Sequence, residues 1–457
     1  MNPPEQSNKP SSPASTGEGP AGRNGVVIPR YGDARSRTRF RTYEVYQRER
    51  VGESTEKIKP QQLTSDAYRT DPYPLLEILR EYYPCYRDWL ANCFWVTRYD
   101  DVTSLLADEA NFATRSKAWV YGQDDFGRDF GQELVVLEAQ AACLKQHTQT
   151  VAARLAHTLQ AGGGGDLVAQ FAARLPLEIL VIGWGIPAAD VDQFVGDYWS
   201  LQRGTSWHPQ LQQRGREAWQ SLLTYLDGLL QSRRAEPGED LVSVLAQLTP
   251  AEGPVTAADV LRTLLEADHQ MLQGALSNLW YLLLTHPQEF DKARSEQRLM
   301  KLAYLETLRH SAPVLSAHRF SRHEVERFGR LLPAGALVVC SAAAANRDPR
   351  IFKNPNKFIV DRQDLCQREP RGQYRADGLA SGIAVALGAP SKHPAIPEDR
   401  PPSRYALTRD AVVTAAQVLL DTVGDVRLAA GAEPRLAALT VGEMHTCWSL
   451  PVEVTHG

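Results

Sequence analysis

The stretch of sequence that decides the fold is ANRDPRIFKNPNKFIVDR, residues 345–362. Upstream of it lies ETLR, residues 306–309, in which Glu306 and Arg309 stand three positions apart. Residues with this spacing share one face of a helix and can form an ion pair there. Between the two stretches, Pro333 and Gly335 predict a hairpin turn within the strand pattern of residues 329–339.

Helical patterns fill most of the chain around these stretches. Residues 93–99 read as a strand rich in aromatic and β-branched residues, and Asp100 follows as the N-cap of a helix. Apolar residues recur at helical spacing over residues 133–160, 167–182, 211–233, 256–286 and 408–421. The sequence therefore predicts a mostly α fold, a large helical domain with small β-sheets at its margins.

Composition divides the chain into an arm and a domain. Residues 1 to about 28 are rich in proline, serine and glycine and offer almost nothing to bury. We expect residues 1–60 to form a disordered or extended N-terminal arm, and residues 61–457 to form a single domain. In the arm, RSRTRFR at residues 35–41 is either a docking segment for an acidic partner or a solvated tail.

Charge and cysteine content exclude several classes of protein. Lysine and arginine number 50 against 54 acidic residues, a formal charge of −4, so no basic surplus favours nucleic-acid binding. No apolar run is long enough for a membrane span, and the N-terminus does not resemble a signal peptide. The six cysteines stand singly, without metal-ligand spacing: Cys85, Cys93, Cys143, Cys340, Cys366 and Cys447. We expect a cytoplasmic protein with reduced thiols and no metal site built from cysteine.

The chain resembles the cytochrome P450 superfamily of haem-thiolate monooxygenases in three stretches. In chain order they are YLLLTHP at residues 281–287, residues 306–309 and residues 345–362. The resemblance covers about residues 70 to 450. It implies the cytochrome P450 fold, with Glu306 and Arg309 forming a triad with Arg362. It also places Arg319 where the family has an arginine that contacts a haem propionate.

The same resemblance locates the haem loop of the family, where the iron ligand is missing. The best match is LASGIAVALGAP, residues 379–390. It puts Ala384 at the histidine position and Ala386 at the position of the cysteine whose thiolate binds iron. Alanine has no lone pair for a metal. An insertion at residues 391–404 follows, and His393 within it is either a substitute nitrogen ligand or a loop residue facing solvent.

The proton relay of the family is also changed. Its acid–alcohol pair on the central helix falls here on Gln270 and Met271. Neither side chain relays a proton as a carboxylic acid or a hydroxyl does. Asp268 and His269 stand beside them, as a displaced relay or as polar lining of the helix.

Two further features follow from the resemblance, and the tryptophans are read separately. The histidine–arginine pair that holds a propionate in the family falls on Ala142 and Gln146, and residues 203–208 cover the substrate entrance and could touch a ligand. The tryptophans follow no stacking motif and are expected to be core or rim aromatics: Trp89, Trp95, Trp184, Trp199, Trp207, Trp219 and Trp280.

These losses predict a catalytically silent member of the superfamily that binds no haem and works by binding a partner protein. In this it resembles haem-free P450-like auxiliary proteins that assist glycosyltransferases in natural-product pathways. The vacated cavity could hold a small apolar ligand. The alternative is a haem-dependent oxidoreductase or monooxygenase, including one that binds haem b without a cysteine thiolate, near Arg319 and His393.

Overall fold

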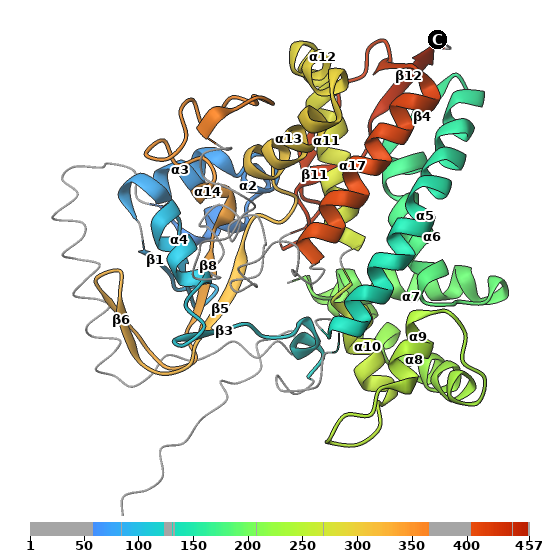
Figure 1. Cartoon of the computed structure of the whole chain (residues 1–457). Coiled ribbons are helices and arrows are strands. Elements are labelled where there is room, and N and C mark those ends of the chain that lie inside the picture. Colours follow the sequence, from blue (N-terminus) through green and yellow to red (C-terminus); the bar gives the residue numbers. More distant parts are fainter. Residues whose placement is uncertain are drawn as a thin grey trace, which may run out of the picture.

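The chain folds as predicted into a mostly helical molecule with small sheets at its margin (Figure 1). The computed structural model describes residues 58–83, 85–122, 130, 133–206, 208–267, 269–364, 404–440 and 442–455. The predicted N-terminal arm, up to residue 57, lies outside the described residues.

The α-helices are α2 (Asp66–Thr70), α3 (Tyr73–Tyr82), α4 (Tyr99–Leu106), α5 (Leu134–Ala161), α6 (Arg174–Gly183), α7 (Val191–Arg203), α8 (Pro209–Ala235), α9 (Leu241–Gln247), α10 (Ala257–Leu265), α11 (His269–Thr285), α12 (Pro287–Ser295), α13 (Gln297–His310), α14 (Ala342–Ala345) and α17 (Arg404–Val423). Shorter helical turns are η1 (Pro60–Thr64), η2 (Lys117–Tyr121), η4 (Val168–Ala172) and η5 (Ala188–Asp190).

The strands are β1 (Cys85–Asp88), β2 (Cys93–Val96), β3 (Phe112–Ala113), β4 (Gly164–Asp166), β5 (Ala317–Ser321), β6 (Val325–Arg327), β7 (Arg330–Leu332), β8 (Leu337–Cys340), β9 (Asp425–Leu428), β10 (Leu436–Ala437), β11 (Thr446–Cys447) and β12 (Pro451–Thr455). The largest sheet has five strands in the order β1-β2-β8-β5-β3. In it β2 and β8 are parallel, with Cys93 opposite Leu337, whereas β5 runs antiparallel to β8.

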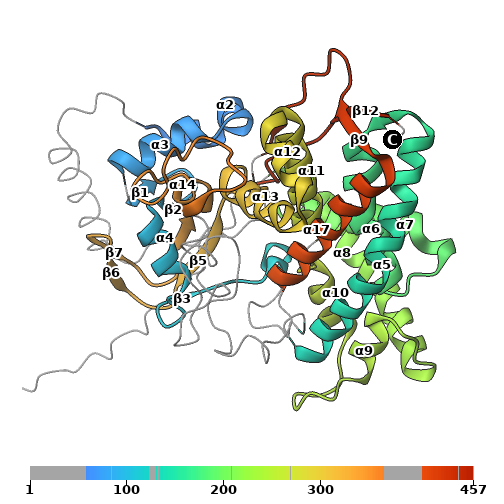
Figure 2. The same cartoon turned by 45° about the horizontal axis from the view of Figure 1, so that its top comes forward.

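A bundle of α5, α6, α11 and α17 forms the other side of the molecule, with α5 and α17 side by side in both views (Figures 1 and 2). Helix α11 is buried around almost its whole circumference from Leu272 to Leu284, mostly through apolar side chains, and Trp280 at its centre is fully buried. A helix with that pattern must lie in the core. Because it contacts α6, α13 and α17, α11 connects the bundle to the rest of the domain.

The helix predicted over residues 256–286 is interrupted. Helix α10 ends at Leu265 and α11 begins at His269. The carbonyl of Leu265 accepts a hydrogen bond from Gln202 Nε2 at 2.8 Å, and that of Glu266 accepts one from the Arg404 guanidinium. Side chains from α7 and α17 thus satisfy carbonyls that a continuous helix would use itself, which stabilises the break.

The hairpin predicted around Pro333 and Gly335 is wrong in its pairing. Strand β7 pairs with β6 through Phe328 and Gly329, which both have positive φ angles, 56° and 67°. Two such residues are the requirement of the tight turn that suits a β-hairpin. The turn at Pro333 instead connects β7 to β8, which belongs to the five-stranded sheet.

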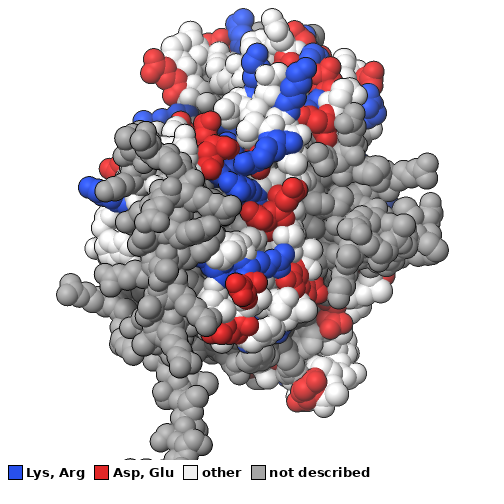
Figure 3. All heavy atoms as spheres, turned by 90° about the vertical axis from the view of Figure 1, so that its left-hand side faces the viewer, with Lys and Arg blue, Asp and Glu red and all other residues white. Residues whose placement is uncertain are grey.

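The surface carries a mixture of charges. Figure 3 shows lysine, arginine, aspartate and glutamate side chains interspersed on the face that it presents, without an extended area of one sign among the described residues there. This mixture agrees with the near-neutral net charge of the chain. Within the described part of the chain, no helix is both long enough and apolar enough to cross a membrane.

Candidate functional site

The structure brings Glu306, Arg309 and Arg362 together in the interior. Arg309 donates from Nε to Glu306 Oε2 at 2.6 Å and from Nη2 to Oε1 at 2.7 Å, while Arg362 donates from Nε to Oε1 at 3.1 Å. The side chains of Glu306 and Arg309 are fully buried, and that of Arg362 is 2% exposed. One carboxylate thus holds two guanidinium groups from segments more than fifty residues apart.

The two arginines also bind the backbone of residues 345–362. Arg309 Nη1 donates to the carbonyls of Asn346 and Pro355, each at 2.8 Å. Arg362 donates to the carbonyls of Lys353 at 2.7 Å and Asn354 at 3.1 Å. The triad therefore fixes this irregular stretch against α13, because its carbonyls have no helix or sheet partners of their own.

Arg319, the residue expected to contact a haem propionate, lies half-buried on β5. Its Nη1 donates to the neighbouring carbonyl of His318 at 2.9 Å, and no carboxylate among the described residues pairs with it. Desolvation lowers the pKa of the guanidinium below its ordinary value. A partly buried cation without an anionic partner fits a ligand carboxylate.

The described cysteines supply no thiolate. Burial raises the pKa of the thiols of Cys340 and Cys447 to about 12, and it also raises those of Cys93 and Cys143. Without a bound metal, a thiol with a raised pKa stays protonated at neutral pH. No cluster of three or more histidine, cysteine or acidic side chains in the described ranges could hold a metal ion.

Several predicted positions lie outside the described residues. They are Asp268 beside the central helix, Ala384 and Ala386 in the haem-loop match, His393 in the insertion, and Cys366. The assignment of Ala386 to the ligand position therefore stays a prediction.

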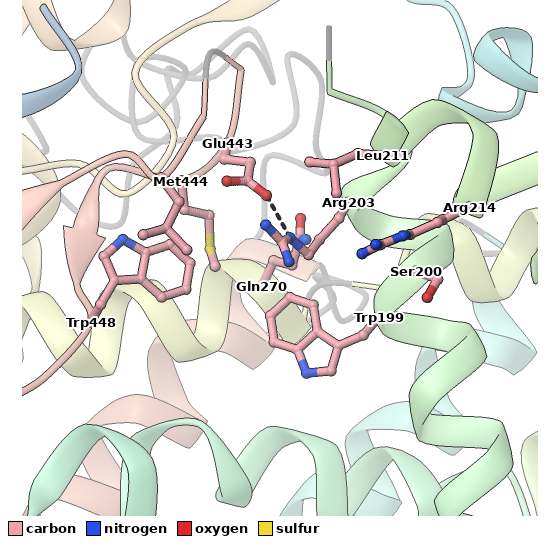
Figure 4. Close-up of a pocket in the computed structure, with 10 residues that line it drawn as sticks. Trp199, Ser200, Arg203, Leu211, Arg214, Gln270, Glu443, Met444 and Trp448 are labelled. Atoms are coloured by element: carbon pink, nitrogen blue, oxygen red, sulfur yellow. Dashed lines mark hydrogen bonds and ion pairs between the residues drawn. The ribbon is translucent and has the colours of Figure 1, made fainter. Parts of the chain in front are cut away.

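A cavity of about 350 Å³ lies between α7, α8, α11 and the segment before β11 (Figure 4). We call it the Arg203 cavity. Arg203 Nε donates to Glu443 Oε1 at 2.7 Å across it. The residues that give it its chemistry are Trp199, Arg203, Arg214, Gln270, Glu443 and Trp448. Its volume lies at the lower end of the range for small-molecule sites.

The two positions predicted to replace the proton relay, Gln270 and Met271, face different environments in the structure. Gln270, which is half-buried, lines the Arg203 cavity, whereas Met271 packs against the main hydrophobic core. The positions assigned to the propionate pair, Ala142 and Gln146, are both exposed on α5. Of these four residues, only Gln270 can meet a ligand in the Arg203 cavity.

Part of this cavity was predictable from local sequence patterns. Arg203 belongs to the stretch expected to touch a ligand, but Trp199 was expected to be an ordinary core or rim aromatic and is instead part of the cavity wall. Glu443 and Trp448 were not anticipated. Glu443 stands 240 positions from its partner Arg203 and belongs to no recognisable motif.

His269 faces a second, smaller cavity. This cavity of about 100 Å³, the His269 cavity, lies between α5, α6, α11 and α17 and is also lined by Cys143 and Arg404. The Tyr198 hydroxyl lies 2.6 Å from His269 Nδ1, while Nε2 is buried and has no partner among the described residues. Nε and Nη2 of Arg404 are likewise buried without partners. The space can hold water, which would satisfy these groups.

His269 should make the protein sensitive to acid. Burial, with a smaller contribution from Lys117, lowers the pKa of His269 to about 3, against about 6.5 in an unfolded chain. Between these values the unfolded state binds the extra proton, so stability falls as pH drops from about 6.5 toward 3. We expect His269→Gln to reduce the slope of unfolding free energy against pH by about 1.4 kcal/mol per pH unit in that window. Urea titrations at several pH values measure it, and equal slopes for the two proteins would contradict it.

Comparison with known proteins identifies relatives across most of the chain. A sequence model of the family described as Cytochrome P450 matches residues 206–368. Cyclomarin C epoxidase CymV of Salinispora arenicola is 29% identical over 72% of this chain and 87% of its own length. Mycinamicin IV hydroxylase/epoxidase of Micromonospora griseorubida is 28% identical over 73% of this chain and 82% of its own.

A solved structure shows the same fold. P450BioI, in its complex with a ligated acyl carrier protein, superposes with a TM-score of 0.67 at 21% identity, covering 85% of this chain and all of that one. That likeness concerns the fold alone.

The expectation of a non-catalytic auxiliary protein is wrong, and the comparisons do not support the expectation that it is haem-free. The relatives are named as epoxidases and hydroxylases, which are oxidising enzymes, and nothing in the comparisons points to a silent member. The expectation inferred the loss of activity from changes at the ligand, relay and propionate positions, but a cavity of substrate size persists beside α11. Haem is the cofactor of the family that carries this fold. Residues 206–368 match the Cytochrome P450 family model, and the chain has the fold of solved cytochrome P450 structures.

Proposed function

We propose that this protein is a haem-dependent oxidoreductase that oxidises a small organic molecule, of the kind made in natural-product pathways. The observation that carries the proposal is the similarity, over more than seventy per cent of the chain, to proteins named as an epoxidase and a hydroxylase/epoxidase. The Arg203 cavity supports it, because it offers a partly open, largely apolar space with a few polar groups beside the central helix α11.

The described residues fit a haem propionate, but they supply no cysteine for the axial position of the iron. Arg319, half-buried and without a close ion pair among the described residues, although Glu109 attracts it electrostatically, fits a propionate. No described cysteine fits as the axial ligand, and the sequence places Ala386 at that position. We therefore propose a haem site without a cysteine thiolate.

The residues at the start of α11 affect whether molecular oxygen or a peroxide is the better oxidant. Gln270 has an amide in place of an acid, and Met271 packs in the core without a hydroxyl. With neither group available to deliver protons, reduction of molecular oxygen is disfavoured. We expect a peroxide to support oxidation better than molecular oxygen with an electron donor.

A haem titration tests the proposal. The full chain, expressed with a haem precursor, should contain close to one haem and one iron per chain, and its carbon monoxide complex should lack the band typical of thiolate ligation. A protein without haem would overturn the proposed function. A thiolate-type band would preserve the function and refute the assignment of Ala386.

Replacing Arg319 should weaken haem retention. Arg319→Gln removes a charge-assisted hydrogen bond to a propionate, an interaction of about 1.5–3 kcal/mol, so we expect haem to be lost at least about tenfold faster. Transfer of haem to a scavenging globin measures the rate. Arg322→Gln is the matched control, because Arg322 lies on the same segment and donates to the carbonyl of Glu109 at 3.0 Å. Equal rates in the two variants would contradict the role given to Arg319.

We further propose that the protein works in the cytoplasm. Five cysteines in the described part of the chain are free thiols, four of them buried, as is usual in a reducing compartment.

A further inference from the structure

The Arg203 cavity contains a buried carboxylate oxygen that the fold leaves unpaired. The Glu443 side chain is only 8% exposed. Its Oε1 accepts the hydrogen bond from Arg203, while Oε2 is buried and has no partner among the described residues. Leaving a buried charged acceptor unsatisfied is costly, so a ligand group that donates a hydrogen bond to Oε2 would be favoured.

The same cavity has an excess of positive charge. Arg214, exposed on α8, lines the cavity and makes no hydrogen bond or ion pair with the described residues. Arg203 uses only Nε for Glu443, and its side chain is 37% exposed. Figure 4 shows the two guanidinium groups pointing toward the same space beside the Trp199 ring. Two guanidinium groups against one carboxylate favour an anionic ligand.

The position for a ligand's hydrogen-bond donor and the position for its anionic group lie next to each other in the Arg203 cavity. Arg203 and Glu443 are in direct contact at 2.7 Å, so a group on Oε2 and a group on the free side of the guanidinium are neighbours. Most of the remaining wall is apolar or aromatic, with Leu211, Met444 and Trp448, and the neutral polar side chains of Ser200 and Gln270 complete it. A ligand must therefore carry its hydrogen-bond donor beside its anionic group, on an apolar body.

We propose that the substrate is a carboxylic acid with an apolar body and a hydroxyl or N–H group on the carbon next to the carboxylate. Its carboxylate pairs with Arg214 and the free side of Arg203, and its hydroxyl or N–H donates to Glu443 Oε2. This inference rests on the proposed function for the statement that the ligand is a substrate, but ligand binding itself requires no haem.

Three ligands that differ in one group each test the proposal by calorimetric titration of the full chain. The probe α-hydroxydecanoate has both groups, decanoate lacks the donor, and methyl α-hydroxydecanoate lacks the charge. Hydrogen bonds to charged groups contribute enough that each omission should weaken binding at least about tenfold. Equal affinities, or no binding of α-hydroxydecanoate, would overturn the proposal.

Two variants test which residues produce the preference for the hydroxy acid. Arg214→Gln should weaken both acids and leave the methyl ester unchanged. Glu443→Gln should abolish the advantage of α-hydroxydecanoate over decanoate without weakening decanoate, because it releases Arg203 from its ion pair. Arg216→Gln is the matched control, since Arg216 lies on the same helix and donates to Gln213 at 2.8 Å outside the cavity. A control that weakens the acids as much as Arg214→Gln would overturn the assignment.

Haem content, measured separately, keeps this inference distinct from the proposed function. A chain that loads haem but shows no preference for the hydroxy acid would refute the substrate class alone. A chain that shows the preference but never binds haem would refute the oxidoreductase and leave the binding site in place.

Discussion

Replacing Glu306 with alanine is expected to lower the free energy of unfolding by about 3–5 kcal/mol. The change removes the carboxylate from between Arg309 and Arg362 and leaves two buried guanidinium groups without a counter-charge. It also removes the acceptor for the backbone N–H of Ile359, which donates to Glu306 Oε1 at 3.0 Å. Urea denaturation of the full chain, followed by circular dichroism, measures the loss.

An exposed pair on the same helix provides the control for Glu306. Glu296 and Arg298, at the start of α13, have side chains 63% and 72% exposed and lie 4.0 Å apart. Glu296→Ala should change the unfolding free energy by less than about 0.5 kcal/mol. Similar losses in the two variants would mean that the triad stabilises the protein no more than a surface ion pair does.

The second large effect is expected from Asn278→Ala, with a loss of about 3 kcal/mol in unfolding free energy. Asn278 is fully buried on α11. Its Nδ2 donates to the carbonyls of Ser311 at 2.8 Å and His445 at 3.1 Å. Its Oδ1 accepts from Thr446 Oγ1 at 2.8 Å and from the backbone N–H of Cys447 at 3.1 Å. Alanine would leave these four groups buried without that partner.

The Asn278 variant should also affect ligand binding. The segment that it holds, at residues 445–447, lies between Glu443 and Trp448 of the Arg203 cavity. We expect α-hydroxydecanoate to bind Asn278→Ala more weakly than the unaltered protein. Gln417→Ala is the control, because Gln417 on α17 bonds only Asp421, at 2.9 Å near the surface. If Asn278→Ala and Gln417→Ala unfold at the same urea concentration, the four hydrogen bonds of Asn278 do not stabilise the protein as expected.

Local sequence patterns predicted the parts of the fold that depend on neighbours along the chain. The spacing of Glu306 and Arg309 places both on one helix face, and helical periodicity gave α5, α8 and α17 within a few residues. The break at Leu265 was missed because it is stabilised by Gln202 and Arg404, which come from other elements. The pairing of β7 was missed because the turn that decides it is at Phe328, outside the expected pattern.

The candidate site was predictable only in part for the same reason. Resemblance to a family located Arg319 and Gln270, since each lies in a recognisable stretch. The place of Glu443 in the site follows only from the fold, which packs the C-terminal segment that contains Glu443 against α7. The functional error came from inferring activity from the haem-binding positions alone, although the cavity wall is formed by four separate segments.

Neighbouring residues at the end of α7 link the cavity to the interrupted helix. Gln202 holds the carbonyl of Leu265, and Arg203, the next residue, holds Glu443. Since adjacent residues of one helical turn make both contacts, any displacement of this turn would disturb both hydrogen bonds. A substitution that alters the cavity at Arg203 should therefore be designed with the α10–α11 junction in view.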